Sequence, residues 1–519
     1  MRMVFARKLF WIYLAPLVAI FSMRVSSLEI FAAFEQAIFP YIAHTPLAQY
    51  FFDPSTPPEE IPLLLSSTTQ QSHVEKIGPI AVALADLGHP VTFICGKAFQ
   101  DYISNLHPNV HFYPFQGLDD KLTPEDYEYW MSLPTGVEKE IWVTKKVIVD
   151  GAPDAHNTYQ AYFKEFRDKY GDQKPLISLF DSSVTGHHTV HLGVPGIKPD
   201  VSIGINLLPL LLHSNETFPP RYGRIPHQGP DAKVLHQKAY ETIKQDDPYE
   251  WEVSQAWWEK LKEMGSPRQE FPQILDGMNR NADQLLAIGI PEFEFTRAEL
   301  DIDVRYFGAL TKARKDKDSA AILPSWWDDL MEAKSKGKKI ICVSQGTVET
   351  LPEELILPTM KVLSDNEELF VIATFYNSEP EEVSGLVVPA NARVAKYVPH
   401  DELLPLVDVM VSNGGYGAVQ KCLFYGVPMV IAGTSQDKAI NAAIAEFTGF
   451  GINLRTQSPD MDDIKNAVEK ILREENYRKT AKKLSKTYDR YDMQRDFETA
   501  VQDAVRSWQK GRKVVKEEL

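Results

Sequence analysis

The stretch VMVSNGGYGAVQKCLFYGVPMVIAG, from Val409 to Gly433, decides the fold of this chain of 519 residues. It has the pattern of a strand, a glycine loop, a helix and a second strand, because the apolar run stops at Asn413 and glycines follow at 414, 415 and 417. Glycines let backbone N–H groups converge on one point. The start of a helix adds unpaired N–H groups and the positive end of the helix dipole. The stretch therefore predicts an anion site suited to a phosphate, although such a loop can also serve packing alone.

Composition sets the outer limits of the interpretation. With 44% hydrophobic and 24% charged residues, the chain is typical of a globular protein, and its length predicts two to three domains. The formal net charge is -16, from 55 basic and 71 acidic residues. Nucleic-acid binding needs a clustered basic surface, so this charge argues against a nucleic-acid partner.

The three cysteines, Cys95, Cys342 and Cys422, lie far apart inside apolar runs. Such positions are typical of buried, unbridged thiols, whereas disulfide frameworks and metal sites show close, regular spacings. We predict neither a disulfide nor a structural zinc ion.

The first residues differ from the rest of the chain. Arg2, Arg7 and Lys8 precede an apolar run from Leu9 to Met23, which is typical of a targeting signal. The run is short for a spanning helix, which needs about 20 apolar residues. We predict that residues 1–52 form a hydrophobic targeting or anchor segment that brings the protein to a membrane, such as the endoplasmic reticulum. In the alternative, this segment packs on the folded body and the protein is cytoplasmic.

From Ile61 the sequence alternates between apolar strands and helices. IPLLLSSTTQ, HVEKIGPIAVALADLGH and PVTFIC read as a strand, a helix that ends at Gly88, and a second strand. Short connections around one helix favour a parallel pair with a right-handed crossover. Further strands are predicted at Val110 to Tyr113 and at Pro175 to Phe180, with a helix beyond Asp181. The first half is predicted to be a doubly wound sheet.

A helical insert interrupts this alternation between about residues 207 and 283. It carries Trp251, Trp257 and Trp258 among charged residues. Tryptophans at helical spacing more often pack in a core than bind a ligand, although they can also line an apolar pocket.

A second α/β series follows a charged run of small residues, Thr311 to Ala321, that reads as a linker. Its predicted strands are KIICVSQG, LFVIATF, RVAKYV, VMVSN and GINL. Helical segments from Asp462 to Arg473 and from Tyr477 to Lys510 end the chain. We predict an α/β fold of two Rossmann-like parallel-sheet domains, 61–310 and 325–475, joined by a linker at 311–324 and followed by a C-terminal helix and tail at 476–519. The two sheets should face each other across a cleft, with ligands at the carboxyl ends of the strands.

Four ordered motifs between Tyr397 and Ala443 make the prediction more specific: YVPHDELLP, VSNGGYGAV, YGVPMV and SQDKAINAA. With them the chain resembles the UDP-glycosyltransferase superfamily, whose members have the two-Rossmann GT-B architecture. The resemblance extends from Pro62 to Tyr491. It is strongest to microbial members that glycosylate natural products or lipids, rather than to plant members with a His-Cys-Gly-Trp signature. It implies that the first domain binds the acceptor and the second binds a UDP-sugar.

The resemblance implies a general base and its partner in the first domain. His73 follows the first strand and matches the family histidine that removes the proton of the acceptor hydroxyl. Asp181 ends a later strand and matches the family aspartate that orients this histidine. Without the resemblance, His73 would be read as a polar residue at a helix start and Asp181 as a helix cap.

The resemblance also implies the residues that bind the sugar donor. Tyr397 matches an aromatic residue that stacks on uracil, with the backbone near Val398 at the base edge. Thr347 beside Gly346 matches a hydroxyl residue on the diphosphate, and Asp437 matches the acid that accepts hydrogen bonds from the sugar. The full predicted set is Gly346, Thr347, Tyr397, Val398, Asn413, Gly414, Gly415, Gly417, Lys421, Asp437 and Lys438.

Several positions depart from the family pattern. Asn413 stands where many relatives have a histidine that donates to the diphosphate, and an amide can donate but carries no charge. Lys421 stands where relatives often have a glutamate on the ribose, and a lysine cannot accept hydrogen bonds. Ala418 replaces a serine, and Lys438 a glutamine.

The resemblance implies inverting, metal-independent transfer of a hexose, in the first place glucose, from a UDP-sugar to a hydroxyl of an apolar small molecule or lipid. The departures at Asn413, Lys421 and Ala418 also allow a GT-B accessory protein with reduced catalysis. A GT-B sugar-nucleotide epimerase is a third hypothesis, and the Trp-rich insert disfavours it.

Overall fold

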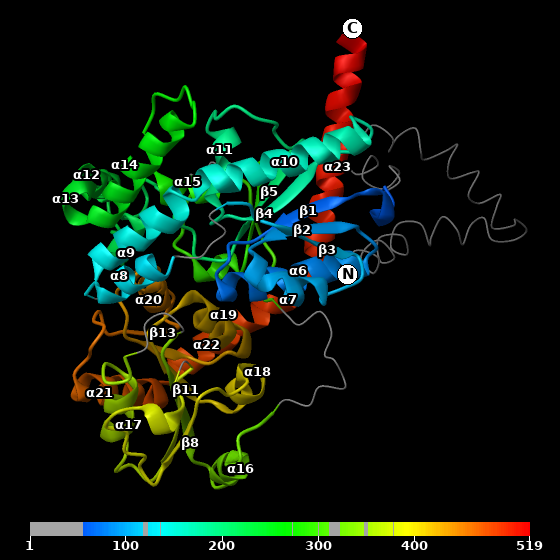
Figure 1. The fold of residues 1–519 in the computed structure, drawn as a ribbon. Helices are drawn as coiled ribbons and strands as arrows, with labels where there is room; N and C mark the ends of the chain where they lie inside the picture. Colours follow the sequence, from blue (N-terminus) through cyan, green and yellow to red (C-terminus); the bar gives the residue numbers. More distant parts are fainter. Residues whose placement is uncertain are drawn as a thin grey trace, which may run out of the picture. The chain divides into compact units, whose positions relative to one another are not determined.

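The structure is a computed structural model that describes residues 56–117, 123–134, 136–271, 273–298, 300, 302–310, 322–346, 351–376 and 378–518 (Figure 1). The chain divides into two compact units at Pro57 and Pro58, and the second unit carries all of the elements below. The predicted targeting segment at 1–52, most of the predicted linker and Thr347 lie outside the described residues.

The first half builds a seven-stranded parallel sheet in the order β3-β2-β1-β4-β5-β6-β7. Its strands are β1 Leu63–Ser66, β2 Val91–Cys95, β3 Val110–Pro114, β4 Ile177–Asp181, β5 Val201–Asn206, β6 Gln284–Ala287 and β7 Val304–Tyr306. The central strands are buried along their whole length, as expected for a parallel sheet with helices on both faces. The doubly wound prediction is confirmed.

Sequence reasoning did not find β5, β6 and β7. β5 interleaves apolar residues with Ser202 and Gly204, and β6 and β7 have only four and three residues. Short strands at one side of a sheet are stabilised by pairing with their neighbours, so their own residues carry little signal.

Helices cover the first sheet and form the insert. They are α6 Gln71–Asp86, α7 Gln100–Ser104, α8 Pro124–Ser132, α9 Val137–Thr144, α10 Ala152–Tyr170, α11 Thr185–His191, α12 Ala232–Glu241, α13 Ile243–Asp246, α14 Pro248–Glu263 and α15 Ile274–Arg280. Trp257 of α14 is buried in the main core, which confirms the packing interpretation for this residue. Trp251 stacks on Phe271.

The second half builds a six-stranded parallel sheet in the order β10-β9-β8-β11-β12-β13. Its strands are β8 Lys339–Ser344, β9 Leu369–Thr374, β10 Ala392–Ala395, β11 Val409–Ser412, β12 Met429–Ile431 and β13 Gly451–Asn453. Its helices are α16 Trp327–Ser335, α17 Ile356–Val362, α18 His400–Leu403, α19 Tyr416–Tyr425, α20 Lys438–Thr448, α21 Met461–Arg473 and α22 Glu475–Thr487.

The predicted continuous helix from Tyr477 to Lys510 is wrong. α22 ends at Thr487, a 3₁₀ turn covers Tyr488–Arg490, and α23 runs from Met493 to Glu518. The break lets α23 run beside the first sheet (Figure 1, red), where Gln494 Nε2 donates to the Ala83 carbonyl of α6 at 2.9 Å. Helix α23, which follows the last helix of the second half, thus packs against the first half.

Direct contacts join the two halves within this unit. Tyr416, in the glycine stretch, is buried, and its hydroxyl donates to the Ile288 carbonyl of the first half at 3.5 Å. Phe293 of the first half meets Phe450 of the second edge to face. The glycine stretch therefore contributes to the packing between the sheets.

The three cysteines are buried and none forms a disulfide, as predicted. Among the described residues, no helix is both long and apolar enough to cross a bilayer.

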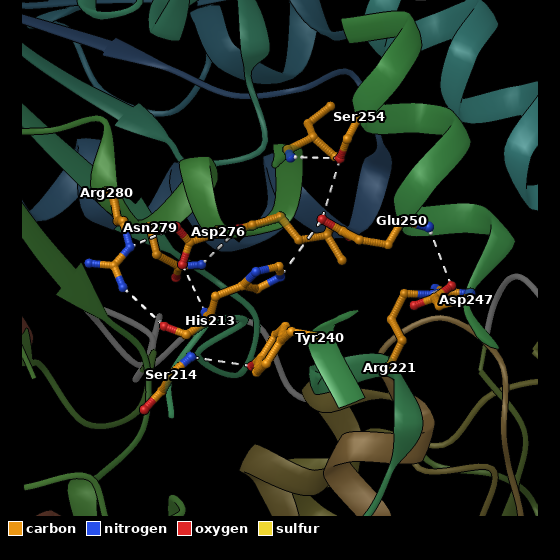
Figure 2. A network of polar contacts seen from close by, with 12 residues as sticks. His213, Ser214, Arg221, Tyr240, Asp247, Glu250, Ser254, Asp276, Asn279 and Arg280 are labelled. Atoms are coloured by element: carbon orange, nitrogen blue, oxygen red, sulfur yellow. Dashed lines mark hydrogen bonds and ion pairs between the residues drawn. The ribbon is translucent and has the colours of Figure 1, made fainter. Parts of the chain in front are cut away.

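The helical insert holds a buried network of ionisable groups, shown in Figure 2. Glu250 of α14 is 2% exposed, accepts a hydrogen bond from Ser254 Oγ at 3.4 Å, and lies 3.9 Å from His213 Nε2. Its other carboxyl oxygen has no hydrogen-bond partner among the described residues. Burial, followed by the charge of Asp247, raises the pKa of Glu250 to about 8, whereas burial lowers the pKa of His213 to about 4. Both groups are therefore neutral near pH 7.

We expect Glu250→Gln to stabilise the protein at neutral pH. Between pH 4.5 and about 8, the unfolded chain loses the Glu250 proton while the folded chain keeps it, so this group lowers stability as the pH rises. The variant should match wild type near pH 4.5 and exceed it by about 4 kcal/mol near pH 7.5, at about 1.4 kcal/mol per pH unit above the unfolded pKa. Melting temperatures across this pH range test the prediction. The control is Glu259→Gln, the same substitution at an exposed site on the same helix. Parallel curves for wild type and Glu250→Gln would contradict the assignment.

Candidate active site

The strand orders of the two sheets locate the candidate active site. In each sheet there are two neighbouring strands from which the chain goes on to opposite edges of the sheet. In the first half, β1 leads to β2 on one side and β4 to β5 on the other; in the second half, β8 leads to β9 and β11 to β12. At such a switch point the connections leave the carboxyl ends of the two strands uncovered, and ligands bind there. His73 follows β1 and Asp181 ends β4, while Gly346 follows β8 and Asn413 follows β11.

The structure brings His73 and Asp181 into direct contact. His73 Nδ1 lies 2.7 Å from Asp181 Oδ2, and both side chains are buried. The carboxylate can only accept, so Nδ1 carries the proton and donates. In the neutral imidazole, Nε2 then keeps its lone pair, which is the arrangement that a general base requires.

Backbone and side-chain donors support the Asp181 carboxylate. Ser183 N–H donates to Oδ1 at 3.0 Å, and the N–H and hydroxyl of Thr68 donate to Oδ2 at 3.4 Å. Burial alone would raise the pKa of Asp181, but the charge and hydrogen bond of His73, with these donors, hold it below the usual 3.8. The stability that this shift adds is present above pH 3.8 and is lost as the pH falls through the lower folded value.

Two positions at the glycine loop require glycine: Gly414 within it, for its positive φ and its contact with Ile431, and Gly433 beside it, for its close approach to the Asn413 backbone. Gly414 has φ +82°, and a Cβ there would lie 2.4 Å from Ile431 Cγ2. Gly433, across the loop, has the Asn413 carbonyl oxygen only 2.0 Å from the position of a Cβ. Asn441 Nδ2 of α20 donates to the Gly414 carbonyl at 2.8 Å. Helix α20 thus holds the shape of the loop.

Asn413 has a buried side chain whose polar atoms are unused. It is 3% exposed, and neither its amide nitrogen nor its amide oxygen has a hydrogen-bond partner among the described residues. A Cβ at Gly346 would lie 3.8 Å from both atoms, so the structure brings these two predicted residues together. A buried amide without a partner costs free energy, which a ligand that bonds it would recover.

Asp437 also joins the loop. Its Oδ2 accepts from Tyr416 N–H at 3.3 Å and from Asn441 Nδ2 at 3.0 Å. The neighbouring Lys438 is buried, and its Nζ donates to Ser435 Oγ and Gln436 Oε1. The Asp437 carboxylate therefore faces the start of α19, whereas the Lys438 ammonium bonds its own turn.

The predicted base-binding residues differ in exposure. Tyr397 is 52% exposed, and its ring meets that of Tyr376 edge to face at 5.7 Å. Val398 is fully buried in the core, backbone included. An exposed ring beside a second ring suits stacking on a flat base.

Lys421 is an exposed residue of α19, one helical turn after Gly417. Its Nζ is 3.7 Å from Asp401 Oδ1, and both side chains are about half exposed. Tyr425 OH also donates to Asp401 at 3.3 Å. The structure gives Lys421 a carboxylate partner.

Sequence reasoning missed four residues of this region: Lys76, Gln345, Tyr376 and Asn441. Gln345 immediately follows β8 and Tyr376 is the second residue after β9, so the rule that sites lie at strand ends could have found them. Lys76 is three residues after His73 on α6 and therefore shares its face of the helix. Asn441 carries no local signal, because only the fold brings it to Gly414.

Among the described residues, no cluster of three or more His, Cys, Asp or Glu side chains is arranged to hold a metal ion.

Comparisons with known proteins identify the family. Residues 359–489 match the model of the erythromycin biosynthesis protein CIII-like C-terminal domain. The UDP-glucosyltransferase avaP of Aspergillus versicolor is 31% identical over 84% of this chain and 95% of its own length. UDP-glycosyltransferase 2 of Phaeomoniella chlamydospora is 29% identical over 83% of this chain and 92% of its own.

Solved structures agree on the fold. The glycotransferase of kitacinnamycin superposes with a TM-score of 0.55 at 17% identity, covering 88% of this chain and 98% of its own. The chain belongs to the UDP-glycosyltransferase superfamily and has the GT-B fold. It is a glycosyltransferase, which confirms the predicted class of enzyme.

We expect Gly433→Ala to distort the glycine loop, because its Cβ would clash with the Asn413 carbonyl, which is backbone and cannot swing away. Overpacking of this kind costs about 1–3 kcal/mol, visible as a lower melting temperature. The matched control is Gly415→Ala in the same loop, where the added Cβ meets nothing within 4 Å and φ is -58°. Equal melting temperatures for the two variants would contradict this account of the loop.

Proposed function

We propose that this glycosyltransferase moves a hexose, in the first place glucose, from a UDP-sugar to a hydroxyl of an apolar small molecule, with inversion at the anomeric carbon and without a metal. The contact of His73 Nδ1 with Asp181 at 2.7 Å carries the proposal, because it leaves Nε2 as a buried, oriented base. The names of relatives support a UDP-glucose donor, since several are UDP-glucosyltransferases.

In the proposed reaction, His73 Nε2 removes the proton of the acceptor hydroxyl while its oxygen attacks the anomeric carbon. The bond between that carbon and the β-phosphate oxygen breaks, and its electron pair leaves with UDP. Asp181 stays ionised and stabilises the imidazolium that forms. Attack from the face opposite the leaving group inverts the anomeric centre.

In the proposed donor complex, the ligand uses the residues at the end of the second sheet. Tyr397 stacks on the uracil ring, and the backbone at Val398 meets the base edge. The diphosphate lies against Gly346, the Asn413 amide and the N–H groups of the Gly414 to Gly417 loop, where fixed donors act most strongly on developing charge. Asp437 exchanges its Tyr416 N–H bond for sugar hydroxyls, and Thr347 is proposed for the diphosphate on the resemblance alone.

The proposed acceptor is a natural product or a hydroxylated lipid, which would yield a glycolipid. Relatives named for such products include 4'-demethylrebeccamycin synthase of Lentzea aerocolonigenes, 27% identical over 85% of this chain. The hypothesis that residues 1–52 bring the enzyme to a membrane fits a lipid acceptor, and it rests on the sequence pattern alone.

We expect His73→Ala and Asp181→Asn each to lower kcat by roughly 10²- to 10⁴-fold, because the first removes the base and the second its orientation. The assay follows UDP release and product mass from UDP-glucose with a panel of apolar hydroxyl acceptors, with and without EDTA. His227→Ala, at an exposed histidine, should behave as wild type. A His73→Ala enzyme with wild-type turnover would refute the base, and loss of activity in EDTA would refute metal independence.

The stereochemistry of the product tests inversion separately. A single displacement on an α-linked UDP-glucose should give a β-glucoside. The coupling constant of the anomeric proton in the NMR spectrum of the product distinguishes the two forms. An α-glucoside would contradict a mechanism with one base and one displacement.

A further inference from the structure

If the proposed function is correct, the diphosphate end of the site needs a positive charge that the glycine loop does not supply. Departure of a nucleoside diphosphate builds negative charge at the glycine loop, and Asn413 supplies only a neutral amide there. The nearby Lys438 ammonium donates to Ser435 and Gln436 in its own turn. A cation from another part of the fold would meet this need.

Lys76 of α6 is in the right position. A Cβ on Gly417, in the first turn of α19, would lie 3.7 Å from both Cε and Nζ of Lys76. The tip of this side chain, which belongs to the first half, therefore reaches the helix start that forms the second half's predicted anion site. Gly417 has no positive φ, so its backbone does not require glycine, and the lack of a side chain keeps the approach to Lys76 open.

The charges around Lys76 match this role. Asp437, Asp181 and Glu75 all interact electrostatically with its ammonium. Burial lowers the pKa of Lys76, and these three carboxylates oppose that effect. The ammonium is thus partly withdrawn from water and interacts with one carboxylate from each half of the site, Asp181 and Asp437.

Helix α6 makes this position a consequence of the catalytic geometry. His73 and Lys76 are three residues apart, so they project from the same face of one helix. The helix that holds His73 on Asp181 therefore also places Lys76 against α19. The unpartnered polar atoms of Asn413 independently indicate that a ligand completes this end of the site.

We propose that Lys76 is a catalytic residue that binds the diphosphate from the first half and stabilises the leaving group, in place of the charge that Asn413 cannot supply. Lys76 stays protonated throughout. The acceptor proton goes to His73, the new bond joins the acceptor oxygen to the anomeric carbon, and the electron pair of the broken bond leaves on the diphosphate beside the Lys76 ammonium.

Nucleotide binding tests the proposal without needing an acceptor. Titrations of the full-length protein with UDP, TDP, uridine and thymidine should show that Lys76→Met weakens binding of the diphosphates by roughly tenfold or more and leaves the nucleosides unchanged, since only the former carry the charge. Lys76→Arg should retain most of the diphosphate affinity. Lys164→Met, which removes an exposed charge on α10, should match wild type. The proposal would be overturned if Lys76→Met lost affinity for nucleosides and diphosphates equally, or lost affinity for neither.

Turnover adds a rescue experiment. Lys76→Met should lower kcat by roughly 10- to 10²-fold with little change in the acceptor KM. Adding Asn413→His to Lys76→Met should raise kcat by roughly tenfold, because it returns a donor that can carry a positive charge to the loop. A double variant whose kcat is no higher than that of Lys76→Met would overturn the idea that Lys76 supplies the charge that Asn413 lacks. If wild type binds UDP or TDP but transfers no sugar, the proposed function fails, while the comparison of diphosphate with nucleoside still decides the role of Lys76.

Discussion

The strand order of the two parallel sheets is the constraint on which the rest of the structure depends. Because β1 and β4 are neighbours whose connections turn away from each other, the chain can place His73 after one strand and Asp181 at the end of the other, 108 residues later, within 2.7 Å. The same order in the second half places Gly346 beside Asn413. Both ends of the site are therefore products of one topological feature used twice.

A buried carboxylate is costly unless its hydrogen bonds are made, and Asp181 satisfies that requirement. Ser183, Thr68 and His73 together supply it with donors, which keeps it ionised and holds the imidazole in one tautomer. Asn413 shows the opposite situation, because its buried amide lacks partners. The hydrogen bonds of Asp181 are complete in the protein alone, whereas the Asn413 amide is left without partners, and we propose that a diphosphate supplies them.

The two halves share the site through particular side chains. Tyr416 leaves the glycine stretch to reach the Ile288 carbonyl, and Lys76 leaves α6 to reach the start of α19. Helix α23 returns from the second half to bond α6, the helix that carries both His73 and Lys76. The proposed chemistry therefore depends on the position of α6, which is fixed by its own contact with Asp181 and by the hydrogen bond from α23.

The sequence by itself determined the α/β alternation, the glycine stretch and its helix, because each of these depends on residues close together along the chain. It also supported the choice of His73 and Asp181 through the family resemblance, and the family is now established. Only the tertiary structure decided the pairing of the short strands β5 to β7, the break between α22 and α23, and the contacts of Asn441 with Gly414, Lys421 with Asp401 and Lys76 with the start of α19. The physical reason is that these features depend on partners distant in sequence, whose approach is set by the packing of whole sheets and helices rather than by any local pattern.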